Sequence, residues 1–106
     1  MNIGLAIQQI RKELGHTQFE LAERCGLSAT SLSQIENGHK RPSQKTIKRI
    51  CIELDVPEVV IYLAAMQETD IPENKKTVYK LIYPSIMSLV MQMVNSEHAL
   101  ILDKML

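Results

Sequence analysis

Residues 17–43 read TQFELAERCGLSATSLSQIENGHKRPS. Thr17 is followed three positions later by Glu20, the spacing of a capping box, in which each side chain bonds the other residue's backbone N–H. Gly26 can end this helix in the left-handed conformation, and Ser28 can cap the next one. That second helix carries its apolar residues inward and ends near Asn37. The stretch therefore predicts two short helices joined by a tight turn.

Further helices are predicted on both sides of this pair. Before it, apolar residues recur every three or four positions through residues 2–14, and Gly15 supplies a stop. After it, Pro42 and Ser43 open a helix that ends near residue 55, and Pro57 opens a short helix that runs to residue 66. With four Gly and four Pro in 106 residues, turn formers are scarce. We therefore predict an all-α chain with five helices in residues 1–66.

The rest of the chain divides into a polar linker and an apolar segment. Residues 67–76 (QETDIPENKK) have lost the apolar period, and residues 77–106 regain it, with Pro84 marking a kink or a helix start. This C-terminal helical extension is too apolar to stay free in water and too short to build its own core. It must dock on its own domain, pair with a second copy or bind another protein.

Four short runs together resemble one known family. TQFELA at 17–22, GLS at 26–28, LSQIENG at 32–38 and RPS at 41–43 resemble the Xre family of Cro- and CI-like phage-repressor helix-turn-helix domains. The resemblance covers about residues 3–66. It implies a five-helix lambda-repressor-like domain that binds a double-stranded DNA operator, usually as a dimer.

The resemblance also assigns roles to single residues. It implies that Gln18 contacts a phosphate and braces the helix at residues 28–37, which reads the operator. It implies a structural salt bridge between Arg11 and Glu36, which joins the first helix to the end of the third. The full set expected to bind DNA is Gln18, Ser28, Ala29, Thr30, Ser33, Gln34, Asn37, Lys40 and Arg41.

The chemistry of the expected reading face suits bases in the major groove. Gln34 can form two hydrogen bonds with adenine, and Thr30 and Ser33 can donate or accept. The methyl groups of Ala29 and Thr30 can pack on a thymine methyl. The alternative is that these small polar residues only solvate an exposed helix face, and for Ala29 and Ser33 the two interpretations are evenly matched.

Charge supports DNA binding only locally. Lys and Arg total 12 and Asp and Glu total 12, so the whole chain has no net attraction to nucleic acid. Residues 39–52 nevertheless contain five cations and no acidic residue. Lys40 and Arg41 directly follow the expected reading helix, where phosphate contact is favoured. For Lys45, Lys48 and Arg49, a plain solvated face is an equal alternative.

Operator recognition by two-fold dimers favours pairing of the C-terminal segment with a second copy. Its apolar residues recur at helical spacing and define the expected dimer contact. These residues are Val78, Ile82, Ile86, Leu89, Val90 and Met93.

Several other classes of protein are disfavoured. No stretch is long and apolar enough for a membrane span and residues 1–15 lack a leader pattern, so we expect a cytoplasmic protein. Cys25 and Cys51 are expected to be buried thiols rather than zinc ligands, since no second Cys or His lies at ligand spacing. No nucleophile with a base and no phosphate-binding glycine loop is recognisable, so neither an enzyme nor a cofactor is expected.

The sequence thus predicts a transcriptional regulator, most simply a repressor that binds a palindromic operator as a homodimer. The alternative is an antitoxin, which would bind a protein partner through residues 77–106 and repress its own operon.

Overall fold

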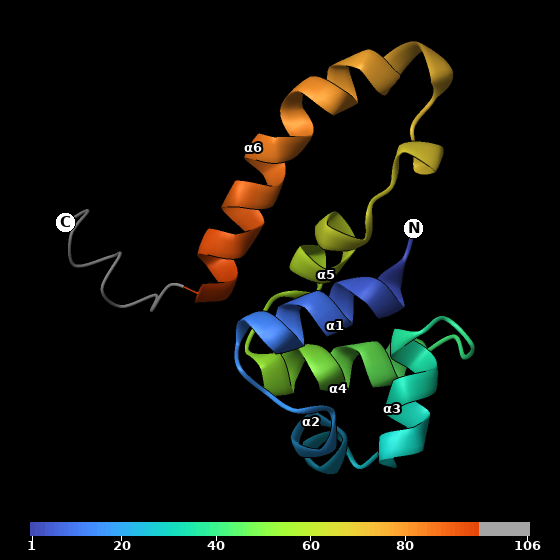
Figure 1. Cartoon of the computed structure of the whole chain (residues 1–106), viewed down its shortest axis with the longest axis vertical. Helices are drawn as coiled ribbons and strands as arrows, with labels where there is room; N and C mark the ends of the chain where they lie inside the picture. Colours follow the sequence, from blue (N-terminus) through green and yellow to red (C-terminus); the bar gives the residue numbers. More distant parts are fainter. Residues whose placement is uncertain (96–106) are drawn as a thin grey trace, which may run out of the picture.

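The computed structural model describes residues 1–95 of the chain (Figure 1). All regular secondary structure within these residues is helical. Residues 96–106, including the apolar Leu100, lie outside the described residues. The elements are α1 (Ile3–Glu13), α2 (Gln18–Cys25), α3 (Ala29–Glu36), α4 (Gln44–Leu54), α5 (Glu58–Ala65), the 3-10 turns η1 (Glu68–Asp70) and η2 (Glu73–Lys75), and α6 (Lys76–Asn95). The predicted all-α fold is therefore confirmed. No helix within residues 1–95 is long and apolar enough to cross a membrane.

Hydroxyl caps start three of the helices, as the sequence predicts. Thr17, Ser28 and Ser43 have extended backbones, and each hydroxyl accepts a hydrogen bond from the backbone N–H three residues later. Only half of the expected capping box forms at Thr17. The Glu20 carboxylate accepts from the Thr17 hydroxyl (3.1 Å) instead of the Thr17 backbone N–H, because the two side chains meet directly.

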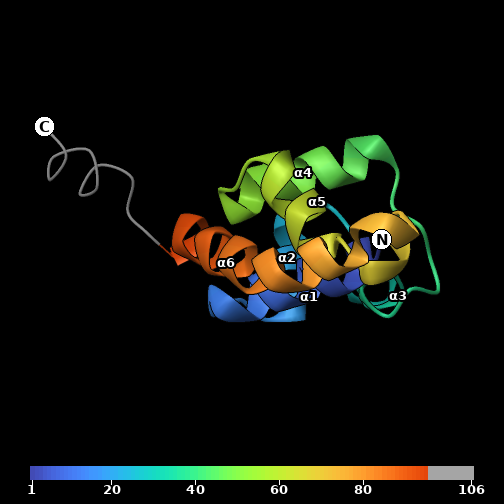
Figure 2. The ribbon, with the colours of Figure 1, turned by 90° about the horizontal axis from the view of Figure 1, so that it is seen from above.

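The core lies between α1, which packs on α3 and α5, and α4, which packs on α2 and α5 (Figures 1 and 2). Each of the α-helices within residues 1–95 contributes to its largest fully buried side chains, which are Ile7, Ile10, Leu21, Leu32, Ile35, Ile50, Val60, Ile61 and Val90. Burying side chains of this size stabilises the fold by about 1.5–3 kcal/mol each before entropy is counted. The same core thus fixes the positions of α2 and α3.

Helix α6 crosses the domain beside α5 and α1 (Figure 2). It starts at Lys76 and continues through Pro84, so the proline is inside the helix and does not begin it. Val90 and Val94 are buried in the core of their own chain, and Ile86 and Met87 pack against it half-buried. The expectation that Val90 faces a partner is corrected, because this side chain is 1% exposed without one.

Four of the other five expected dimer residues remain uncovered. Val78, Ile82, Leu89 and Met93 are 48% to 61% exposed. Successive helix residues lie about 100° apart, so these four form a stripe roughly a third of a turn from the buried one. Helix α6 therefore has two apolar faces, of which one covers its own domain and the other meets solvent.

Candidate nucleic-acid interface

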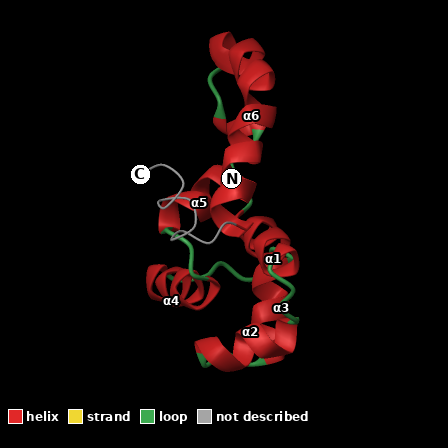
Figure 3. Ribbon diagram, turned by 90° about the vertical axis from the view of Figure 1, so that its left-hand side faces the viewer, coloured by secondary structure: helices red, strands yellow, loops and turns green. Residues whose placement is uncertain are grey.

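Helices α2 and α3 form a compact corner at one end of the domain (Figure 3). Gly26 ends α2 with φ of 69°, a left-handed conformation that costs glycine nothing and other residues about 1 kcal/mol or more. Leu27 is half-buried against the core, and its N–H bonds the Ala22 carbonyl oxygen at 2.9 Å. Ser28 then caps α3. The turn is thus held on both sides, which fixes the direction of α3 relative to α2.

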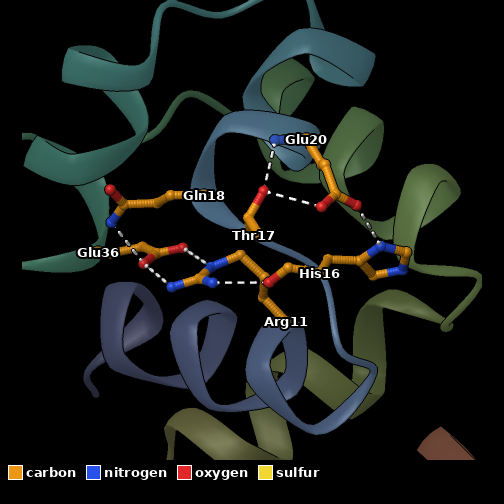
Figure 4. A network of polar contacts seen from close by, with 6 residues as sticks. All are labelled: Arg11, His16, Thr17, Gln18, Glu20 and Glu36. Carbon is orange, nitrogen blue, oxygen red and sulfur yellow. Dashed lines mark hydrogen bonds and ion pairs between the residues drawn. The ribbon is translucent and has the colours of Figure 1, made fainter.

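A buried ion pair joins α1 to the end of α3 (Figure 4). The Arg11 Nε lies 2.8 Å from Glu36 Oε2, and its Nη2 donates to Glu36 Oε1 at 2.9 Å. Two parallel bonds of this kind fix the mutual orientation of the two groups. The two side chains are 8% and 1% exposed. The ion pair that the family resemblance implies is therefore present in the structure.

Two more contacts extend this pair into a network. The Gln18 Nε2 donates to Glu36 Oε1 at 2.9 Å, and the Arg11 Nη1 donates to the His16 carbonyl oxygen at 2.8 Å (Figure 4). Glu36 therefore receives bonds from α1 and from the first residue of α2. The network ties the last turn of α3 to both of the preceding helices, so that α3 cannot shift alone.

Gly4 completes this support and was missed by sequence reasoning. It is buried in α1. A Cβ added to it would collide with the Ile35 carbonyl oxygen and would lie 3.1 Å from the Glu36 carbonyl oxygen. Only a glycine lets the two backbones approach so closely. The available signal was a glycine inside a helix, where it costs about 1 kcal/mol relative to alanine unless packing requires it.

The expected reading face is open to solvent. Ala29, Thr30 and Gln34 are exposed and Ser33 is half-buried, all on the side of α3 away from the core. Ser28 has a different position. Its hydroxyl oxygen accepts from the Ser31 N–H at 3.0 Å, so its first role is to cap the helix.

The loop after α3 folds back along the helix. Asn37 is not left-handed (φ −91°); its Oδ1 accepts from the His39 N–H at 3.1 Å, and Gly38 takes the positive φ of 83°. The Lys40 N–H bonds the Gln34 carbonyl oxygen at 3.0 Å, and its ammonium bonds the Ser31 hydroxyl at 2.9 Å. Lys40 therefore lies against the flank of α3, and Arg41 is exposed beside it.

The cations of α4 do not behave alike. Arg49 pairs with Glu53 at 2.9 Å and also donates to the Arg24 carbonyl oxygen at 2.9 Å. Lys45 and Lys48 are exposed and take part in no ion pair of residues 1–95. Arg49 thus has a structural role between α2 and α4, whereas the ammonium groups of Lys45 and Lys48 are free to bind an anionic group.

The cysteines have the character of protonated thiols. Burial, reinforced by the Glu58 carboxylate, raises the pKa of Cys51 to about 11. Burial and then Glu53 also raise the pKa of the half-buried Cys25, with Arg49 opposing them. Within residues 1–95, no cluster of three His, Cys, Asp or Glu side chains is placed to hold a metal ion.

Residues 7–61, just over half of the chain, match the helix-turn-helix family HTH_3. The chain is a member of this family. The Xre-type helix-turn-helix that the sequence resembles is thereby confirmed. The chain is 40% identical over 65 residues to the ImmF control region 10 kDa protein of Bacillus phage phi105, and this match covers 61% of the chain and 72% of the phage protein.

Two further proteins that the chain resembles are named as regulators. The chain is 42% identical over 55 residues to the transcriptional regulator SinR of Bacillus subtilis, which covers 51% of the chain and 50% of SinR. It is 38% identical over 56 residues to the immunity repressor of phage phi105, covering 53% of the chain and 39% of the repressor. The chain therefore spans half or less of these two longer proteins.

A solved structure shares the fold. The crystal structure of the clp gene regulator ClgR from Corynebacterium glutamicum superimposes with a TM-score of 0.62 at 24% sequence identity. The match covers 79% of this chain and 89% of ClgR. It extends beyond the 55 residues of the family match, and it supports the helical lambda-repressor-like architecture.

Proposed function

We propose that this HTH_3 protein is a DNA-binding transcriptional regulator, and specifically a repressor that reads a palindromic operator through α3 as a homodimer. The observation that carries the proposal is the exposed polar face of α3, which the network of Arg11, Gln18 and Glu36 holds in a fixed orientation. Relatives named as repressors and transcriptional regulators support it. The activity needs no catalytic group, and the protein would act in the cytoplasm.

In this proposal the exposed side chains of α3 read base edges in the major groove. Gln34 pairs its amide with adenine, the Thr30 hydroxyl reaches a neighbouring base, and Ala29 packs on a thymine methyl. Ser33 contributes less because it is half-buried. A good bidentate pair discriminates against a wrong base by about 1–3 kcal/mol.

The surrounding groups would hold the DNA backbone in register. The Lys40 ammonium lies against α3 at Ser31, and Arg41 follows it in the same loop, so both are placed for phosphates that flank the groove. Gln18 donates one amide hydrogen to Glu36 and has a second one for a phosphate. The backbone around Asn37 would add N–H donors.

The uncovered stripe of α6 is the proposed dimer contact. Val78, Ile82, Leu89 and Met93 would pair with the same residues of a second copy, since a two-fold interface uses one patch twice. Ile86 would lie at the edge of this contact because it is half-buried on its own domain. Two heads joined in this way match an operator of two half-sites.

Selection of binding sites from random DNA, followed by a mass measurement on the complex, tests the proposal. We expect a two-fold symmetric sequence bound by two chains. Recovery of no enriched sequence under low-salt conditions would overturn DNA reading by α3. An enriched site without symmetry, bound by one chain, would overturn the dimer alone.

The same exposed stripe favours a second candidate, an antitoxin that covers a toxin with α6 and represses its own operon. Co-expression with the neighbouring genes distinguishes the two. A second polypeptide bound in fixed ratio, and released by Leu89→Asp, would support the antitoxin. A homodimer that keeps its mass in the presence of those products would support the simple repressor.

A further inference from the structure

A hollow of about 400 Å³ lies where the end of α2 meets α4. We call it the α2–α4 hollow. It is lined by Cys25, Lys45, Thr46, Lys48, Arg49 and Ile52. Its volume falls in the range of small-molecule sites, which is about 300–1,000 Å³.

The cations of the hollow stand on one face of α4. Lys48 and Arg49 come three and four residues after Lys45, so each is a neighbour of Lys45 on the helix surface. Like charges at these spacings destabilise a helix, and Glu53 compensates only Arg49. Lys45 and Lys48 form no ion pair with any described carboxylate. The hollow therefore has a positive charge that an anion would balance.

Part of the lining of the hollow is apolar, and one of its charged side chains is held in place. Ile52 is 69% exposed beside the half-buried Cys25, which leaves apolar surface without a cover. Arg49 is held between the Arg24 carbonyl oxygen and Glu53, so it spans α2 and α4 in a defined position. This part of the site is therefore preformed before a ligand binds.

We propose that the α2–α4 hollow binds a small anion with an apolar body, such as a medium-chain or aromatic carboxylate. The carboxylate lies between the Lys45 and Lys48 ammonium groups, and the hydrocarbon covers Ile52 and Cys25. Charge-assisted hydrogen bonds and burial of apolar surface then act together. Nothing in this site depends on the proposed regulatory function.

The adjoining hollow is a worse site for such an anion. It has a volume of about 550 Å³ and shares Lys48 and Ile52, but Asp55 and Glu58 also line it. Those carboxylates repel a second anion. DNA bound along α3 is a worse occupant of the α2–α4 hollow, because the hollow is lined by residues of α4 and by the last residue of α2, and by no residue of α3.

The site also touches the helix-turn-helix. Cys25 is the last residue of α2, and Gly26 begins the turn that leads into α3. A molecule in the hollow therefore contacts the segment that orients the reading helix, although binding can be measured without DNA.

The test is a titration of the full chain with octanoate, followed by calorimetry and by NMR. We expect one molecule to bind per chain, with shifts in the amide signals of residues 25, 45–49 and 52. Octan-1-ol and octylamine match the chain length but lack the negative charge, and we expect no binding at the same concentrations. Equal binding of the alcohol would overturn the charge argument.

Replacement of the two lysines tests whether octanoate binds in the α2–α4 hollow. Lys45→Gln with Lys48→Gln should weaken octanoate binding by about tenfold or more, the loss expected for removing charged partners. Lys12→Gln, an exposed lysine on α1, serves as the matched control and should bind like the unaltered protein. A double variant that keeps its unfolding midpoint and its octanoate affinity would overturn the proposal.

Protection of Cys25 gives a second readout. In a Cys51→Ala background, saturating octanoate should slow alkylation of Cys25 by iodoacetamide, whereas octylamine should not. If the Cys51 replacement fails to fold, the alkylation of each thiol can be followed in the unaltered chain by peptide mass. Unchanged Cys25 alkylation at saturating octanoate would place the ligand elsewhere.

Discussion

Gln34 has the largest reading capacity among the exposed residues of α3, because its amide can both donate to and accept from one base. We expect Gln34→Ala to weaken binding of the selected operator by about 1–3 kcal/mol and to relax the preference at one base position. Fluorescence titration against the operator and its single-base variants measures both effects. Gln9→Ala, the same change at an exposed position of α1, should leave both unchanged.

Glu36 has a structural role, because its almost fully buried carboxylate accepts hydrogen bonds from Arg11 and Gln18. Glu36→Gln leaves the buried guanidinium of Arg11 without its counter-charge, which costs about 3–5 kcal/mol. Urea unfolding should report that loss. Glu53→Gln breaks the more exposed pair with Arg49 and should cost about 1 kcal/mol or less. Similar losses in both variants would contradict the role of burial.

The thiols give a pH-dependent readout. Because burial raises the pKa of Cys51 from about 9 to about 11, its thiolate is rare at pH 8, and alkylation should be slow in the folded protein and fast in urea. The unfolded state loses this proton first as pH rises, so the free energy of unfolding should fall between pH 9 and pH 11. Peptide mapping and urea titrations check both. Rapid alkylation of folded Cys51 at pH 8 would contradict this account.

At the scale of the helices, local chemistry predicted most of the boundaries. Thr17, Ser28 and Ser43 each satisfy a free N–H of the helix that follows, and Gly26 takes a left-handed backbone, so neighbours in sequence carry the information. The closeness of α1 to α3 depends on Gly4 and Ile35, which are 31 positions apart, and has no local signature. A glycine inside a helix is unfavourable by itself, and only the packing of α1 on α3 explains Gly4.

Replacement of Gly4 tests that close contact. Gly4→Ala should raise the intrinsic stability of α1 by about 1 kcal/mol, but its Cβ meets the backbone carbonyl of Ile35, and overpacking of this kind costs about 1–3 kcal/mol. We expect a net loss in unfolding free energy and weaker operator binding, because the end of α3 must move. A gain in stability would show that the two helices can separate without cost.

The reading face could be anticipated only with the help of the family resemblance. Helical spacing showed that Thr30 and Gln34 point away from the core, but spacing alone does not tell a DNA-facing surface from a solvated one. Helical spacing also could not tell which apolar residues of α6 face the chain's own domain. Leu89 and Val90 are neighbours in sequence but lie on different faces of α6, and only the packing of α6 on the domain shows that Val90 is covered and Leu89 is not.

For the whole molecule, the two faces of α6 imply that folding and dimer formation can be separated. Val90 and Val94 stabilise the domain, whereas Ile82 and Leu89 contribute to the proposed contact between copies. A single reading head on a chain with no net charge has little general attraction to DNA. Joining two heads makes the second contact intramolecular, which can raise the overall affinity by about 10²–10⁴-fold.

Ile82→Asp combined with Leu89→Asp should therefore give a monomer that keeps its helix content and unfolding midpoint, because both side chains are about half exposed or more in the single chain. Its operator affinity should fall by at least about tenfold, since the avidity of two heads is lost. Sedimentation equilibrium and operator titration measure the two properties on one sample. Leu81→Asp is the control, because Leu81 is 76% exposed but lies on α6 about a quarter turn beyond the uncovered stripe. If the double variant stays dimeric, the copies meet through another surface; if Leu81→Asp also gives a monomer, the contact is broader than the stripe that we assign to it.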